Sequence, residues 1–265
     1  MDILLQIIET KKARVAAAKK LRPLAELRDG AMRARQVSGR HALRDALTQN
    51  KRINIIAEFK RRSPSKGEIR HHADPVAIAK TYQLGGAVAV SVLTEADYFA
   101  GSLDDLRAVR QAISLPILRK DFIFDEYQVY ESAAAGADAL LLIVAALDGD
   151  SLVRLRTITE DDLGMDALVE VHTSEELGRA VQAGARVIGV NNRDLSTFEV
   201  SLETSVQLAS RTPDGAVLIS ESGIESALDI QRLRAVGYRG FLIGETLMRA
   251  DNPKELLEEL SLAQA

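Results

Sequence analysis

The stretch of residues 53–67, INIIAEFKRRSPSKG, places an acid and a base at the end of an apolar run. Successive side chains of a strand point to opposite faces, so Glu58 and Lys60 are predicted to share one side. A carboxylate beside an ammonium group shifts the proton affinity of both, which acid–base chemistry uses. Pro64 and Gly67 then end the strand, and the cationic loop that follows Lys60 is predicted to face an anion.

Charged or amide side chains follow further apolar runs later in the chain. These residues are Lys120, Glu170, Asn191 with Arg193, and Glu221. Taken singly, a Lys or Glu at such a place is usually a solvated surface residue. Together with Glu58 and Lys60, they indicate one cavity in which acids and lysines perturb one another's proton affinities.

The elements that must position these residues repeat along the chain. Short apolar runs rich in β-branched residues alternate with helical patterns from residue 53 onward, which favours parallel strand pairing. Glycine at the end of the preceding helix announces several of the strands. The predicted strands cover residues 53–59, 87–93, 115–118, 139–144, 167–171, 187–190, 216–219 and 240–243.

Eight such units in 265 residues predict an α/β protein, a single (β/α)₈ TIM barrel, which typically needs about 250 residues. A doubly wound open sheet is the alternative, and it is disfavoured because no G-x-G-x-x-G follows the first strand. We expect one domain over residues 1–265, of which 1–50 form an amino-terminal helical extension. An amphipathic helix is predicted over the first twenty residues, and a second helical region is predicted to be interrupted at Gly30 and at 37–39.

The residues after the seventh and eighth apolar runs indicate a phosphate site, because barrel enzymes commonly bind phosphate after strands seven and eight. Ser222 and Gly223 follow the seventh run, and Gly244 and Glu245 follow the eighth, so backbone N–H groups are available there. Arg193 and Lys60 would add positive charge. The alternative is that both glycines serve only as turn residues.

Composition excludes several classes of protein. With no cysteine the chain has no disulfide, thiolate metal site or thiol nucleophile, and its four histidines show no metal-binding spacing, so no metal is expected. A net charge of −4 argues against a nucleic-acid-binding protein. The longest apolar run, residues 139–147, is too short to span a bilayer, and no signal-like segment is evident. A cytoplasmic protein is expected.

The chain resembles indole-3-glycerol phosphate synthase, a barrel enzyme of tryptophan biosynthesis, over essentially its whole length. The motifs that support the resemblance have the family's order and spacing. They are IIAEFKRRSPSKG (55–67), SVLTEADYFAGS (91–102), LPILRKDFI (115–123), GADALLLIV (136–144), LVEVH (168–172), IGVNNRDL (188–195), SESGI (220–224) and FLIGETLM (241–248).

The resemblance implies a carbon–carbon lyase without a metal or organic cofactor. Its substrate would be 1-(2-carboxyphenylamino)-1-deoxyribulose 5-phosphate, which closes to an indole with loss of carbon dioxide and water. Lys120 matches the general acid that protonates the ketone oxygen, and Glu170 matches the acid that assists the later dehydration. Whether Lys60 or Glu170 delivers the dehydration proton stays open. Lys60 also matches a contact to the substrate, and Glu58 matches a residue that holds or deprotonates its neighbours.

The remaining site residues are also implied by the resemblance. Asn191 and Glu221 match residues that hold the sugar hydroxyls and the lysines. Glu245 stands where some relatives have a hydroxyl residue, and an acid there would repel phosphate unless its side chain points away. The expected substrate- and phosphate-binding residues are Lys60, Ser63, Phe99, Phe122, Leu141, Arg193, Ser222, Gly223, Gly244 and Glu245.

Two other functions stay open at this point. The first is a different phosphate-binding barrel enzyme, either phosphoribosylanthranilate isomerase or an aldolase that forms a Schiff base through Lys60 or Lys120. The second is a non-catalytic barrel that binds a metabolite. The expected partner is a small molecule, with no nucleic acid or membrane, and we expect a monomer, with dimerisation through the amino-terminal helix as the alternative.

Overall fold

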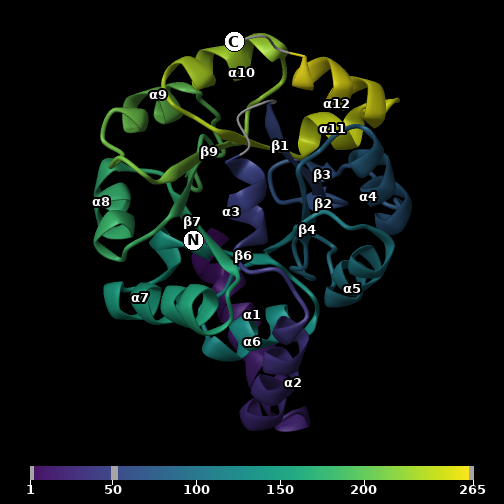
Figure 1. Cartoon of the computed structure of the whole chain (residues 1–265), viewed down its shortest axis with the longest axis vertical. Helices are drawn as coiled ribbons and strands as arrows, with labels where there is room; N and C mark the ends of the chain where they lie inside the picture. The colour runs from purple at the N-terminus through teal and green to yellow at the C-terminus, as the bar shows by residue number, and fades with distance from the viewer. Residues whose placement is uncertain (1–2, 49–52, 263–265) are drawn as a thin grey trace.

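The computed structural model describes residues 3–48 and 53–262, and within them eight parallel strands close into a barrel (Figure 1). Each strand is followed by a helical segment, as the (β/α)₈ prediction requires, so the predicted fold is confirmed. The strands, in their order around the barrel, are β1 (Asn54–Phe59), β10 (Gly240–Ile243), β9 (Val217–Glu221), β8 (Val187–Asn191), β7 (Asp166–Val171), β6 (Ala139–Ile143), β5 (Ile117–Lys120) and β4 (Ala89–Leu93).

Three strands run past their predicted ends, and β6 stops one residue short, at Ile143. β5, β8 and β9 each extend past the expected last residue, to Lys120, Asn191 and Glu221. These polar side chains were expected just beyond the apolar runs, but the parallel ladder continues through them, pairing Leu93 with Lys120 and Asn191 with Glu221. The polar residues therefore sit on the rigid barrel rather than on loops.

Most of the helices after β1 begin where a short polar side chain caps them. Asp74, Ser102 and Thr173, for example, each accept a backbone N–H of the first helical turn, which satisfies a group that the helix itself leaves unpaired. The main helices after β1 are α4 (Pro75–Leu84), α5 (Leu103–Ala112), α6 (Glu126–Ala134), α7 (Gly149–Thr157), α8 (Ser174–Gln182), α9 (Glu203–Ala209), α10 (Ala227–Ala235), α11 (Glu245–Arg249) and α12 (Pro253–Ser261).

Glycine ends several of these helices, as predicted. Gly136 follows α6 with φ +92°, and Gly184 follows α8 with φ +76°, a left-handed conformation that strains any residue with a Cβ atom. Each glycine turns the chain back toward the start of the next strand.

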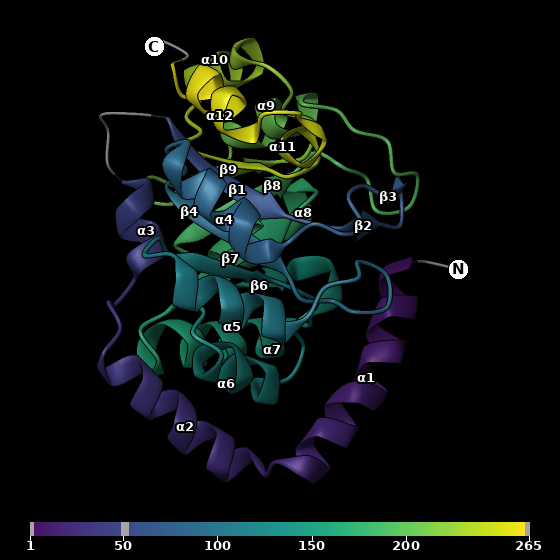
Figure 2. The same ribbon diagram turned by 90° about the vertical axis from the view of Figure 1, so that its right-hand side faces the viewer.

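Three helices precede the barrel: α1 (Ile3–Leu21), α2 (Leu24–Gln36) and α3 (Ala42–Leu47). Figure 2 shows that they wrap around it, with α1 beside the carboxyl ends of the strands, α2 along α6 and α3 at the opposite end. The predicted interruption at Gly30 is wrong, because α2 continues through it; the cost of one glycine is only about 1 kcal/mol. The predicted boundary of the extension at residue 50 lies outside the described residues.

Helix α3 closes the amino-terminal end of the barrel. Its Leu43 and Leu47 are fully buried and join the cluster of side chains that fills the barrel interior, which includes Ile56, Leu168 and Ile219. Gly240 leaves room for this packing, since a Cβ atom there would lie 2.9 Å from Leu47 Cδ2. The interior is therefore a packed core at this end and opens only at the other.

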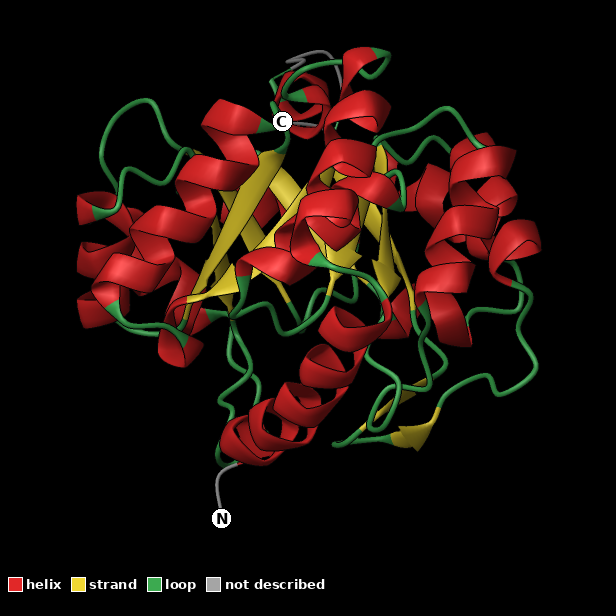
Figure 3. Ribbon diagram, turned by 90° about the horizontal axis from the view of Figure 1, so that it is seen from below, coloured by secondary structure: helices red, strands yellow, loops and turns green. Residues whose placement is uncertain are grey.

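A short antiparallel hairpin of β2 (Arg62–Ser63) and β3 (Gly67–Glu68) lies in the segment after β1, which was predicted only as a loop. Figure 3, seen from below, shows the hairpin beside helix α1 at the mouth of the barrel. Among the described residues, no helix is long and apolar enough to cross a membrane.

Candidate active site

A cavity of about 700 Å³ opens at the carboxyl ends of the barrel strands. Every site residue predicted from the sequence lines it, although the residues come from distant parts of the chain. They are Glu58, Lys60, Ser63, Phe99, Lys120, Phe122, Leu141, Glu170, Asn191, Arg193, Glu221, Ser222, Gly223, Gly244 and Glu245.

Glu58 and Lys60 lie on one side of the chain at the end of β1, as the strand period predicts. Lys60 Nζ is 2.8 Å from Glu58 Oε1, and both side chains are largely buried. Gly244, at the end of β10, makes space for this carboxylate, because a Cβ atom on Gly244 would overlap Glu58 Oε1. The glycine therefore does more here than allow a turn.

Lys120 lies between two carboxylates from other strands. Its Nζ is 3.1 Å from Glu170 Oε2, to which it donates a hydrogen bond, and 3.3 Å from Glu221 Oε2. Neither oxygen of Glu221 accepts a hydrogen bond of good geometry from any described residue. The cluster thus keeps acceptor capacity for a ligand.

Burial and charge separate the proton affinities of these three groups. Burial opposes the charge on Lys120, but the carboxylates of Glu170, Glu221 and Glu58 outweigh it and raise the pKa of Lys120 above its usual value. Burial also disfavours charge on Glu170, yet Lys120 and His172 lower its pKa overall. For Glu221, burial dominates over Lys120 and raises the pKa to about 8. The site therefore holds a charged ammonium, a carboxylate and a carboxylic acid near neutral pH.

Asn191 links the reactive cluster to the loop after β9. Its Oδ1 accepts hydrogen bonds from the Ser222 hydroxyl at 2.9 Å and from the Arg193 backbone N–H at 3.1 Å, and its side chain also contacts Glu170. Ser222 has φ +67°, which is rare for a residue with a side chain. The hydrogen bond to Asn191 supports this strained backbone at the edge of the cavity.

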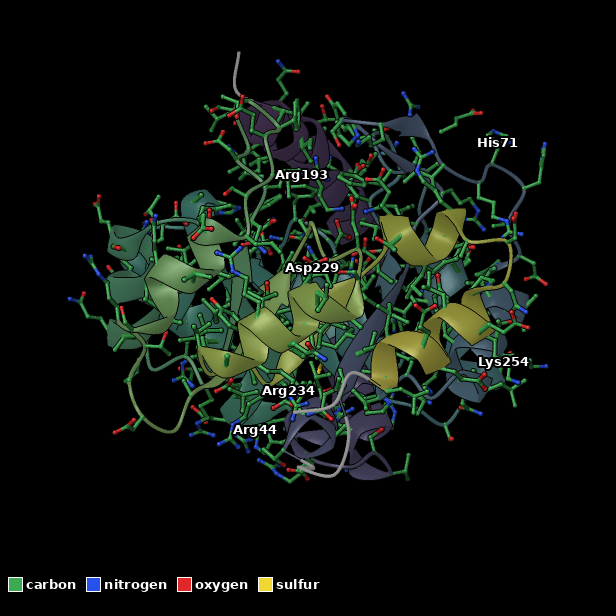
Figure 4. All side chains as sticks on the ribbon, turned by 90° about the horizontal axis from the view of Figure 1, so that it is seen from above. Arg44, His71, Arg193, Asp229, Arg234 and Lys254 are labelled. Carbon is green, nitrogen blue, oxygen red and sulfur yellow. The ribbon has the colours of Figure 1, made fainter. Side chains whose placement is uncertain are left out.

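The predicted phosphate side of the cavity contains an acid surrounded by cations. Glu245, the first residue of α11, lies 3.7 Å from Lys66, 3.8 Å from Arg193 and 3.2 Å from Arg249. Figure 4 shows Arg193 on the α1 side of the barrel. The Glu245 carboxylate thus neutralises cations that an anionic ligand would otherwise meet.

The cationic loop after β1 only partly faces the cavity. Lys60 and Lys66 line it, but the prediction is wrong for Arg61 and Arg62. Arg61 instead forms an ion pair with Asp105 at 2.5 Å, and its guanidinium lies 4.8 Å from the ring centroid of Phe59. Arg62 lies in the short strand β2 and is exposed.

Apolar side chains form the opposite wall. The rings of Phe99 and Phe122 lie 6.0 Å apart between centroids, and Leu141 is buried beside the reactive cluster. Helix α1 adds Ile3, Leu4 and Ile7, which were not among the predicted site residues. Their helical spacing was the available signal, but it does not show which surface the apolar face covers.

A buried ion pair ties α1 to the strand that holds Lys120. Lys11 Nζ lies 2.6 Å from Asp121 Oδ1, with side-chain exposures of 9% and 0%. Asp121 also accepts hydrogen bonds from Thr94 and Arg119, so it is held from three elements. Lys11 was predicted only as part of the polar face of a helix, because nothing in the sequence identifies so distant a partner.

Gly189 is a further position that sequence reasoning did not select. It lies on β8, and a Cβ atom there would overlap Glu221 Oε1 and lie 3.1 Å from Leu168 Cδ1. The carboxylate of Glu221 therefore occupies space that only glycine leaves free.

The fold and this cavity define a (β/α)₈-barrel enzyme with a lysine–glutamate acid–base cluster. Solved structures with the same fold include the thiamine phosphate pyrophosphorylase of Pyrococcus furiosus, with TM-score 0.60 and 17% identity over 82% of this chain and 95% of that one. KGPDC from Streptococcus mutans has a TM-score of 0.62 and 15% identity, and the match covers 79% of this chain and 96% of that one. At these identities the likeness concerns the fold alone.

The sequence relatives identify the family. A family model described as indole-3-glycerol phosphate synthase matches residues 4–260. The indole-3-glycerol phosphate synthase of Carboxydothermus hydrogenoformans is 48% identical over 261 residues, covering 96% of this chain and 98% of the relative. The indole-3-glycerol phosphate synthase of Kineococcus radiotolerans is 47% identical over 268 residues, covering 100% of this chain and 97% of the relative. The chain belongs to the indole-3-glycerol phosphate synthase family.

Proposed function

We propose that this chain closes the indole ring of 1-(2-carboxyphenylamino)-1-deoxyribulose 5-phosphate in tryptophan biosynthesis, with Lys120 as the general acid. The observation that supports this best is the position of the Lys120 ammonium group. It lies within 3.1 Å and 3.3 Å of Glu170 and Glu221 inside the cavity. Since these acids raise its pKa, Lys120 is protonated when substrate binds, as a proton donor must be.

Ring closure requires a proton at the ketone oxygen. The aromatic carbon that bears the carboxylate attacks the ketone carbon, and Lys120 protonates the developing alkoxide to a hydroxyl group. The carbon–carboxylate bond then breaks and releases carbon dioxide. The electron pair of that bond stays with the ring and restores its aromaticity. Lys120 is left as a neutral amine, and Glu170, hydrogen-bonded to it, relays back to it the proton that the later dehydration releases.

Dehydration requires one acid and one base. The departing hydroxyl takes a proton to leave as water, and the neighbouring ring carbon loses a proton to form the double bond. In our proposal Lys60 or Glu170 supplies the acid, and Glu58 positions Lys60 from 2.8 Å away. Asn191 and Glu221 hold the sugar hydroxyls in this proposal, since both line the cavity and neither oxygen of Glu221 accepts a hydrogen bond of good geometry from the described residues.

The ends of the substrate are assigned to opposite walls. The aromatic ring packs on Phe99, Phe122 and Leu141, while the phosphate lies near Arg193 and the backbone of Ser222, Gly223 and Gly244. Ser63 lies at the same mouth, in strand β2. Glu245 must move away from Arg193 for the phosphate to approach. We further propose a cytoplasmic monomer that requires no metal or organic cofactor.

The test is a continuous fluorescence assay in buffer that contains EDTA. Because the chain has no tryptophan, indole emission reports product alone. We expect emission to rise at the same rate with and without chelator, and to stay flat for Lys120→Ala. A flat trace from folded wild-type protein would overturn the proposal. Borohydride trapping of an adduct at Lys60 or Lys120 would instead favour the aldolase alternative.

A further inference from the structure

His172 lies directly after β7, one residue beyond the strand that holds Glu170. Its side chain is only 11% exposed, and it is not among the residues that line the cavity. The ring lies between two carboxylates: Nδ1 is 3.1 Å from Glu176 Oε2, and Nε2 is 3.4 Å from Glu170 Oε1. His172 is therefore in contact with Glu170 from behind the reactive cluster.

Glu176 fixes the orientation of the imidazole ring. The same Glu176 oxygen that faces Nδ1 also accepts the backbone N–H of His172 at 2.7 Å, which anchors the carboxylate at the start of α8. A carboxylate only accepts hydrogen bonds, so Nδ1 must bear a proton. The ring is thereby held with Nε2 directed at Glu170.

The protonation state of Nε2 decides whether this contact is favourable. In the neutral ring with a proton on Nδ1, Nε2 presents a lone pair to a carboxylate oxygen, so two acceptors face each other. Nε2 is buried and has no hydrogen-bond partner of good geometry among the described residues. A second proton converts the repulsive contact into an attractive one that needs only a small rotation to shorten.

The charges around the ring favour the same state. The groups that face His172 are Glu170 on β7, Glu176 on α8 and Glu221 on β9, while Lys120 on β5 lies behind Glu170. Burial lowers the pKa of His172, but the hydrogen bond to Glu176 and the charges of Glu170 and Glu176 outweigh it and raise the pKa.

We infer that His172 is a positioning residue of the synthase reaction: as an imidazolium it bridges Glu176 to Glu170 and holds the Glu170 carboxylate against Lys120. The inference rests on the proposed function, because the proton transfers of Glu170 matter only if the ring closure takes place. Two protein elements, β7 and α8, thus fix the acid–base partner of Lys120 through a side chain that does not touch the substrate.

The kinetic test compares the pH dependence of kcat for wild type, His172→Gln and His41→Gln. Glutamine keeps a hydrogen-bond donor without the charge, so Glu170 should take up a proton at higher pH and the acidic limb of kcat should move up by about 1 pH unit. KM at pH 8 should stay within about twofold, because His172 lies outside the cavity. His41 also contacts a buried carboxylate, that of Asp166 at 3.3 Å, but at the opposite end of the barrel, so His41→Gln should leave the limb in place.

A second variant keeps the test possible if the first does not fold. If His172→Gln does not fold, Glu176→Gln removes the anchor and one negative charge, and the same upward shift of the acidic limb is expected. His172→Lys, which restores a cation, should move the limb back toward wild type. An unchanged acidic limb in folded His172→Gln or Glu176→Gln, with loss of thermal stability alone, would overturn the inference and leave His172 a structural residue.

An equilibrium measurement separates this inference from the proposed function. With only four histidines in the chain, the His172 ring can be followed by nuclear magnetic resonance of labelled imidazoles. The Glu170→Gln substitution should lower the titration midpoint of the His172 ring by about 1 pH unit. If wild type shows no turnover but this shift appears, the proposed function fails while the coupling stands; if the shift is absent, the inference fails whatever the activity.

Discussion

The two ends of strand β7 place a buried acid beside a histidine, with opposite consequences. At the start, Asp166 accepts the backbone N–H of Arg44 at 3.0 Å and lies 3.3 Å from His41. At the end, Glu170 faces the Lys120 ammonium and His172. One partner of Asp166 is a backbone N–H, which cannot ionise, whereas the Lys120 and His172 side chains that face Glu170 both can. The first pair therefore holds α3 to the barrel, and the second is able to transfer protons.

A second pair of residues shows the same contrast. Asp138 at the amino-terminal end accepts the backbone N–H of Ile117 and an ion pair from Arg110 at 2.8 Å. Glu221 at the mouth is also buried but accepts no hydrogen bond of good geometry from the described residues. Asp138 is thus satisfied at the closed end of the barrel, whereas Glu221 keeps acceptor capacity where a ligand binds.

The largest expected effect comes from Lys120→Ala at the reactive end. Loss of a positioned acid should lower kcat by about 10²–10⁴-fold, while the barrel still folds because its interior cluster is unchanged. Steady-state indole fluorescence and thermal unfolding would measure the two quantities. Near wild-type kcat would remove Lys120 from the role of acid.

Gly189→Ala should lower kcat by up to about 10²-fold, because the added methyl group displaces the Glu221 carboxylate from its place beside Lys120. Gly178, in the middle of exposed α8, is the matched control, since a Cβ atom there meets nothing within 4 Å. Gly178→Ala should leave kcat unchanged and raise the free energy of unfolding by about 1 kcal/mol or less. Equal kcat for the two alanine variants would contradict the role given to Gly189.

Asp166→Asn tests the structural end. The amide should weaken the contacts to His41 and α3 and lower the free energy of unfolding by about 1–3 kcal/mol, with kcat unchanged. Chemical denaturation and the fluorescence assay on the same preparation would measure both. A fall in kcat without a fall in the free energy of unfolding would contradict the structural role proposed for this end of the barrel.

The smallest effect concerns pH. The pKa of Glu221 is raised to about 8 in the folded protein, so between its ordinary value and about 8 the folded state binds more protons than the unfolded state. The stability that depends on this proton is present below that window and is lost as pH rises through about 8. We therefore expect wild type to lose stability relative to Glu221→Gln between pH 5 and pH 9, measured by denaturant unfolding at each pH. If the difference in the free energy of unfolding between wild type and Glu221→Gln stayed constant from pH 5 to pH 9, Glu221 would be ionised throughout this range.

Much of the barrel followed from the sequence because its signals are local. Every predicted strand is present, since apolar runs bounded by glycine and helix caps specify a β/α unit without distant information. The predicted site residues share one cavity because parallel strands bring all their carboxyl ends to one face. Their roles stay predictions, as does the assignment of residues 1–265 to one domain.

The features that were missed depend on distant contacts or on backbone geometry. The Lys11–Asp121 ion pair joins two segments whose approach no local pattern specifies. Gly189 was passed over because a glycine has no chemistry of its own, and its use appears only when the neighbouring carboxylate is seen. The charged surroundings of Glu245 likewise combine α11 with loops after β1 and β8.

The path of the amino-terminal helices has a consequence for how the protein is made. The ribosome completes α1 and α3 first, yet Lys11 finds its partner only after β5 has emerged, and Leu47 packs against Gly240 of the last strand. Contacts between the two ends of a chain form slowly because a long loop must close. The apolar side of α3 therefore stays incompletely covered until the last strand is made, and over that interval a chaperone could bind it.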